Sequence, residues 1–116
     1  MTKSFKFPRT ARLLTPAAYK RVFNHSKKLN YREFTVYISR NELDNPRLGL
    51  AVSKKAAKKA VTRNQIKRII RESFRLRQYE LKGWDIVIVA RYAAGQLSQQ
   101  QLSALIQNVW KRLGSC

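Results

Sequence analysis

The stretch KKAAKKAVTRNQIKRIIRESFRLR, residues 54–77, combines a helical apolar pattern with a high density of positive charge. Ten of its 24 residues are Lys or Arg, and Glu72 is the only acidic one. At about 100° per residue, one arc of a helix gathers its mostly apolar positions. The positions of this arc are Ile66, Ile69, Ile70, Ser73 and Phe74. The pattern therefore predicts an amphipathic helix that packs this arc against a core.

Two local signals predict where this helix starts. Thr62 and Gln65 form a T-x-x-Q capping box, in which each side chain can bond the backbone N–H of the other residue. Val61 and Ile66 occupy the N′ and N4 positions, where they can pack as a hydrophobic staple. We therefore expect the helix to begin near Arg63.

An adjacent arc of the same helix, roughly 100° wide, carries most of the charge. It contains Asn64, Lys67, Arg68, Arg71 and Arg75, and Lys54, Lys55, Lys58 and Lys59 lead into it. Like charges at i and i+4 destabilise a helix by roughly a few tenths of a kcal/mol each, and a solvated face normally intersperses acids among them. Glu72 lies only on the border of the arc, so we expect the repulsion to be unrelieved. The pattern favours binding to a polyanion, and arginine can bind phosphates bidentately.

The composition of the whole chain supports the same interpretation. Its 116 residues include 25 basic and 6 acidic side chains, which give a formal net charge of +19. Such self-repulsion destabilises a compact state, so nucleic acid is the leading partner and an anionic membrane surface is the alternative.

No apolar run is long enough to span a bilayer. The basic, partly irregular segment 1–14 lacks the apolar stretch of a secretory signal. The single cysteine, Cys116, permits no intramolecular disulfide, so we expect a reducing, cytoplasmic location.

The flanking segments predict a single α+β domain over residues 1–116, built as a sandwich of helices on a sheet. A first helix is expected from Thr15, because TPAAYKRVF places proline at its first helical position. The alternating runs EFTVYIS (33–39) and RLGLAVS (47–53) predict two strands joined as a hairpin, and a short strand near 29–31 is weakly indicated. The continuous apolar run WDIVIVA (84–90) predicts a strand covered on both faces.

The last helix should open at Ser98, with Gln101 completing an S-x-x-Q capping box, and should end at Gly114. Its apolar stripe consists of Leu102, Leu105, Ile106, Val109, Trp110 and Leu113. The predicted order is therefore helix, two or three strands, helix, strand, helix.

Residues for protein-based catalysis are scarce. A nuclease needs paired acid and base groups or clustered carboxylates that hold metal ions, but the six acids of this chain are scattered. His25 is the sole histidine, and we interpret it as a helix-end or surface residue. With four glycines the chain has no glycine-rich phosphate loop. The chain by itself is therefore not expected to be catalytic.

Residues 59–75, KAVTRNQIKRIIRESFR, resemble the signature of the bacterial ribonuclease P protein component, A-x-x-R-N-x-[I/L]-K-R-x-x-[R/K]. The matching residues are Ala60, Arg63, Asn64, Ile66, Lys67, Arg68 and Arg71. FPRTARLLTPAAYKRVF, LGLAVSKK and DIVIVAR are similar to the N-terminal segment and first helix, the strand before the motif and the last strand of that family. The resemblance thus covers essentially the whole chain. Gln65 departs from it, because many members carry a third basic residue there, and this puts one phosphate contact in question.

The resemblance implies an αβββαβα fold with a left-handed βαβ crossover, a fold also known from a ribosomal protein domain. It also implies a ribonucleoprotein endoribonuclease, in which an RNA subunit that holds Mg²⁺ cleaves the 5′ leader from precursor tRNA. The protein, expected at one copy per RNA, would bind the catalytic RNA and the leader. It would also broaden the substrate range and lower the Mg²⁺ requirement.

The resemblance further assigns site residues. The basic helix and its lead-in would face the catalytic RNA through Lys58, Lys59, Arg63, Asn64, Lys67, Arg68, Arg71 and Arg75. A cleft for the single-stranded leader would be formed by Tyr19, Phe23 and Tyr37, with Lys54 and Lys55 near its mouth. Aromatic stacking and positive charge suit single-stranded RNA. Spacing alone favours a core role for Tyr19 and Phe23, whereas Tyr37 points away from the apolar face of its strand.

Three other classes of protein share some of these features. A small ribosomal protein is equally basic and equally poor in catalytic groups. A DNA-binding protein is less favoured, because no helix-turn-helix spacing is present. A membrane-surface helix is weaker still, because the Ile and Phe arc is needed for the core.

Overall fold

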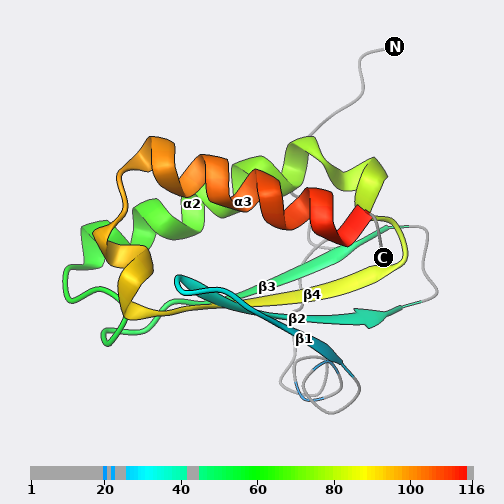
Figure 1. The fold of residues 1–116 in the computed structure, drawn as a ribbon, viewed down its shortest axis with the longest axis horizontal. Helices are drawn as coiled ribbons and strands as arrows, with labels where there is room; N and C mark the ends of the chain where they lie inside the picture. Colours follow the sequence, from blue (N-terminus) through cyan, green and yellow to red (C-terminus); the bar gives the residue numbers. More distant parts are fainter. Residues whose placement is uncertain (1–19, 21, 23–25, 42–44, 115–116) are drawn as a thin grey trace.

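The computed structural model describes residues 20, 22, 26–41 and 45–114. Its strands are β1 (Lys27–Asn30), β2 (Phe34–Arg40), β3 (Arg47–Ala51) and β4 (Trp84–Ala90). Its helices are α2 (Ala60–Leu76) and α3 (Gln99–Gly114), with short 3₁₀ helices η2 (Gln78–Leu81) and η3 (Tyr92–Gln96). Figure 1 shows α2 and α3 side by side on one face of a four-stranded sheet. The α+β architecture predicted from the sequence is confirmed.

The strand order β1-β2-β4-β3 shows that the predicted hairpin is wrong. β2 and β3 do not pair, because β4 lies between them. Val87 of β4 is opposite Tyr37 in the antiparallel β2 pairing and opposite Gly49 in the parallel β3 pairing. The central position suits β4, because a continuous apolar strand is stable when its backbone is bonded on both edges and both faces are covered. The α2 helix joins the parallel strands β3 and β4 and so provides the βαβ crossover.

The main core lies between the sheet and the two helices. Its helical residues are Ile66, Ile70 and Phe74 from α2 and Leu102, Ile106, Val109, Trp110 and Leu113 from α3. The indole Nε1 of Trp110 donates a hydrogen bond of 2.8 Å to Ser73 Oγ. The Trp110 ring also meets Phe74 edge to face, with centroids 5.9 Å apart. The apolar arcs predicted for both helices are therefore confirmed, although Ile69 and Leu105 are only half-buried.

The opposite face of the sheet is covered at its centre by Val22, which is helical and fully buried against Val87. Tyr37 and Val89 pack against this pair and are partly buried. β4 is thus covered on both faces, as its sequence predicts. Lys20 of the predicted first helix is also helical and is exposed, and the other positions of that helix lie outside the described residues.

The start of α2 differs from the prediction. The helix begins at Ala60, and its N-cap residue Lys59 forms no side-chain cap. The backbone N–H of Arg63 donates to the carbonyl of Lys59 at 3.1 Å. Thr62 therefore lies inside the first helical turn and cannot be the N-cap residue. Val61 is 67% exposed and cannot act as a staple.

The capping box predicted for α3 is present. Ser98 N donates to Gln101 Oε1 at 2.9 Å, and Gln101 N donates to Ser98 Oγ at 3.1 Å. These two bonds satisfy backbone donors that have no intrahelical partner. The helix runs from Gln99 to Gly114, as the sequence predicts.

A buried carboxylate, Asp85, ties the β2–β3 connection to the central strand. Arg47 donates to it through Nε at 2.8 Å and through Nη2 at 2.6 Å, and Asn41 Nδ2 donates to it at 2.9 Å. Asn41 Nδ2 also donates to the carbonyl of Asn45 at 3.1 Å. The hydrogen bond to Asp85 raises the pKa of Arg47 above its ordinary value. The contribution of Arg47 to stability is lost only when pH rises through that raised pKa, so Arg47 remains charged throughout the physiological range.

We expect Asp85→Asn to lower the free energy of unfolding by about 2–3 kcal/mol, because it leaves a partly buried guanidinium without its charged acceptor. Urea denaturation of the two proteins measures the difference. Glu80→Gln is the matched control, since it breaks an exposed Arg77–Glu80 pair and should cost less than about 1 kcal/mol. Equal losses in the two variants would contradict a structural role for the buried pair.

Candidate nucleic-acid interface

The basic side chains of α2 lie on the side of the helix away from the core. Asn64, Arg68 and Arg71 are exposed, and Lys67 is half-buried. Lys58 and Lys59 are also exposed, immediately before the helix. Residues 54–71 contain eight Lys or Arg side chains and no acid, and we call this segment the basic pole. Its position on the fold agrees with the arc predicted from the sequence.

Charge in the last turns of α2 is partly neutralised, and the expectation of unrelieved repulsion is wrong there. Arg75 Nη2 lies 2.7 Å from Glu72 Oε2, and Arg77 Nη1 lies 3.0 Å from Glu80 Oε2. Exposed pairs of this kind add little stability. Their consequence is electrostatic, because they reduce the net positive charge of the segment that follows the basic pole.

Arg63 has a contact that its motif did not reveal. Its Nη1 donates hydrogen bonds to the carbonyl of Ala57 at 2.9 Å and to that of Lys58 at 2.7 Å. The guanidinium therefore holds the segment that leads into α2, which carries Lys58 and Lys59. Arg63 thus shapes the basic pole as well as adding charge to it.

The segment after β3 turns sharply and presents Lys54 and Lys55 to solvent. Both Ala56 N and Ala57 N donate to the carbonyl of Ser53, at 3.1 and 3.2 Å, and the two alanines are buried. η3 packs against this turn through Gly95, where an added Cβ would lie 2.6 Å from the Ala56 carbonyl oxygen. The lysines are therefore carried by a turn that is fixed on two sides, by Arg63 and by Gly95.

Tyr37, predicted for the leader cleft, is half-buried on the sheet face opposite the main core. The Nζ of Lys28 lies 5.8 Å from the centre of its ring, and the two residues are direct partners in the β1–β2 pairing. Lys28 was missed because β1 was only weakly indicated, but once β1 is placed the register identifies it. Lys54 and Lys55 follow β3, which β4 separates from the strand of Tyr37. Tyr19 and Phe23 lie outside the described residues.

The acidic side chains of the described residues do not gather into a metal site. Asp85 is buried against Arg47, and Glu72 and Glu80 are each paired with an arginine. Within the described ranges, no group of three or more His, Cys, Asp or Glu could hold a metal ion. No helix among these residues is long and apolar enough to cross a membrane.

Comparison with known proteins gives one consistent result. The family described as Ribonuclease P matches residues 7–114 of the chain. The ribonuclease P protein component of Photobacterium profundum is 46% identical over 107 residues, which cover 92% of this chain and 91% of that protein. The RNase P protein of Staphylococcus aureus superposes with a TM-score of 0.81 at 35% identity, covering 87% of this chain and 93% of that one. The RNase P protein of Thermotoga maritima gives 0.76 at 31% identity, covering 87% and 96%.

We expect Gly95→Ala to lower the free energy of unfolding by about 1–3 kcal/mol, because its methyl group must displace the backbone carbonyl of Ala56. The substitution should also speed hydrogen exchange at the Ala56 and Ala57 amides, which urea denaturation alone would not reveal. Gly114→Ala is the control, since a Cβ there meets no atom within 4 Å. Unchanged exchange in Gly95→Ala would show that η3 does not fix the lysine turn.

Proposed function

The chain belongs to the family of bacterial ribonuclease P protein components, and from this we propose that it binds a catalytic RNA and helps that RNA remove the 5′ leader from precursor tRNA. Membership makes it a subunit of a ribonucleoprotein endoribonuclease. The observation that carries the proposal is the basic pole, a segment with eight cationic side chains and no acid, in which six of the eight are exposed.

The proposed contribution of the basic pole is electrostatic. The catalytic RNA and the precursor both carry dense negative charge and repel each other. Cationic side chains that neutralise phosphates release counterions, so binding weakens as salt rises, by a slope of about −0.7 to −0.9 per phosphate contact. Lys58, Lys59, Arg63, Asn64 and Lys67 would contact the catalytic RNA, together with Arg68, Arg71 and Arg75. The salt bridge to Glu72 makes Arg75 the weakest of these contacts.

The proposed leader site lies on the other face of the sheet, at Tyr37. A half-buried ring with a lysine near it offers a stacking surface and a positive charge, which is how single-stranded RNA is bound without much sequence readout. Lys28 joins the residues assigned to this cleft by resemblance, namely Tyr19, Phe23, Tyr37, Lys54 and Lys55. Binding the leader there would favour precursor over mature tRNA, since mature tRNA has none.

The chemistry of cleavage is assigned to the RNA. Among the described acids, Asp85, Glu72 and Glu80 are each paired with an arginine, and no three acids, histidines or cysteines of the described residues gather, so the metal would be held mainly by the RNA subunit. Neutralising phosphates would lower the Mg²⁺ concentration that assembly requires and would broaden the range of substrates. We propose one protein per RNA and a cytoplasmic location.

The test is cleavage of precursor tRNA at low Mg²⁺ by three samples: the protein alone, ribonuclease P RNA alone, and the two together. We expect efficient cleavage only in the mixture. A folded, RNA-binding protein that gives no enhancement would favour a ribosomal or other RNA scaffold. Cleavage by the protein alone would overturn the assignment of the chemistry to RNA.

We expect Tyr37→Leu to weaken binding of precursor tRNA to the assembled enzyme by about tenfold while leaving mature tRNA unaffected, because leucine keeps the packing and removes the stacking face. Tyr79→Leu is the control, since Lys82 lies 5.5 Å from that ring on η2, far along the chain from the cleft residues. Affinities for both tRNAs are measured with each variant. Equal losses for precursor and mature tRNA would contradict the leader site.

A further inference from the structure

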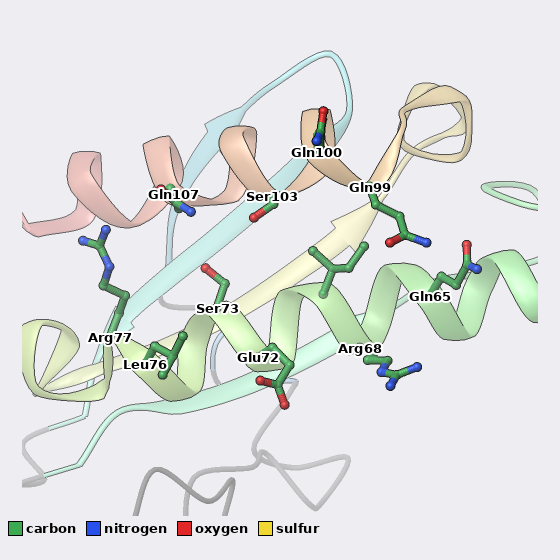
Figure 2. A pocket seen from close by; sticks show the side chains of 11 residues that line it. Gln65, Arg68, Glu72, Ser73, Leu76, Arg77, Gln99, Gln100, Ser103 and Gln107 are labelled. Carbon is green, nitrogen blue, oxygen red and sulfur yellow. The ribbon is translucent and has the colours of Figure 1, made fainter.

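A groove of about 730 Å³ runs between α2 and α3, on the side of the helices away from the sheet. Figure 2 shows side chains from both helices along it, with Gln65 and Gln99 near one end and Arg77 and Gln107 near the other. Ile69 and Leu76 supply apolar surface to it, and Leu76 is 57% exposed. The volume is within the range of sites that hold small organic ligands. We call it the α2–α3 groove.

Amide groups dominate the polar lining of this groove. They belong to Gln65 of α2 and to Gln99, Gln100 and Gln107 of α3. None of these four side-chain amides forms a hydrogen bond with the described part of the chain, so both their donors and their acceptors are available. Residues 93–110, which include most of α3, contain no charged side chain. The α3 wall therefore offers hydrogen bonds without net charge.

The α2 wall supplies charge at its edge. Arg68 is exposed, forms no ion pair among the described residues, and belongs to both the groove and the basic pole. Glu72 also lines the groove and is paired with Arg75 outside the set of lining residues. Figure 2 shows Glu72 and Arg68 projecting from the side of α2 away from α3, so these charges lie at the edge of the groove, where the unpaired Arg68 favours a phosphate. Arg77, at the far end, is already paired with Glu80. The charges thus select a ligand with a neutral part inside and an anionic part at Arg68.

We propose that the α2–α3 groove binds an unpaired nucleobase of the RNA that lies along the basic pole, with the adjoining phosphate on Arg68. Glutamine amides can pair bidentately with the edge of adenine. Ile69 and Leu76 cover part of the base, and unpaired bases are the parts of RNA that proteins read most readily. This inference rests on the proposed function, because it needs RNA along α2.

The first test is an NMR titration of ¹⁵N-labelled full-length protein with three probes: a short oligoadenylate, an oligouridylate and an oligomer of the same length without bases. We expect oligoadenylate to shift the side-chain amide signals of Gln99 and Gln100 most, and the baseless oligomer to shift the Arg68 signal but not those amides. Equal shifts of the amides with the baseless oligomer would show a phosphate site and overturn the proposal.

The second test measures the affinity of groove variants for ribonuclease P RNA over a range of salt. Ser103 lines the groove and its neighbour Ala104 is exposed outside it, so Ser103→Phe should fill the groove and Ala104→Phe serves as the control. We expect binding about tenfold weaker for Ser103→Phe with an unchanged salt slope, and a change below about twofold for Ala104→Phe. Gln100→Ala combined with Gln107→Ala, at two exposed positions, should give a similar loss without a risk to folding.

A fourth variant separates the groove proposal from the proposed function. Arg68→Glu with Arg71→Glu should weaken RNA binding and reduce the salt slope by about one unit or more. If this variant loses affinity while Ser103→Phe matches Ala104→Phe, the groove proposal fails and the proposed function stands. If wild-type protein neither binds the RNA nor promotes cleavage, the proposed function fails. Self-association in sedimentation that Ser103→Phe abolishes would assign the groove to a second copy of the chain and overturn the proposal.

Discussion

The position of β4 at the centre of the sheet is the constraint on which the rest of the structure depends. Its backbone pairs with β2 on one edge and with β3 on the other, and its faces are covered by the helix layer and by Val22. Because β3 and β4 are parallel neighbours, α2 must cross from the end of one to the start of the other. That crossing sets α2 on the surface with its basic side facing out. The pairing of β3 with β4 also places Arg47 beside Asp85, so the central strand anchors the β2–β3 connection as well.

Much of the fold could be predicted because it is recorded in local periodicity. Helical spacing identified the core sides of α2 and α3, and the capping box at Ser98 and Gln101 located the start of α3. Strand pairing could not be predicted, since alternation shows which face of a strand is buried but not which strand is its neighbour. The start of α2 could not be predicted from its T-x-x-Q pattern, because such a pattern is compatible with a cap but does not require one. The Arg63 N–H donates to the Lys59 carbonyl, which places Thr62 inside the first helical turn.

The candidate interface could also be predicted only in part. The basic pole was predictable, because its residues are close in sequence and share a helix face. The contacts that shape it were not, since Arg63 reaches back to backbone carbonyls and Gly95 approaches the lysine turn from a segment far along the chain. Lys28 became visible only through the register of β1 and β2. The α2–α3 groove likewise requires two helices to be placed side by side, which no single stretch of sequence specifies.

The contrast between the basic pole and the uncharged segment 93–110 has a consequence for the kinetics of association. A molecule whose charge is spread evenly would be drawn to RNA in any orientation, and most collisions would have to be corrected by rotation. Here eight cations and no acid gather in the basic pole while residues 93–110 carry no charge, so the field of an approaching polyanion exerts a torque as well as an attraction. The protein is turned toward its RNA before the two surfaces touch. Residues 93–110 carry no charge and add no electrostatic attraction of their own, so the first encounter with RNA is directed by the basic pole.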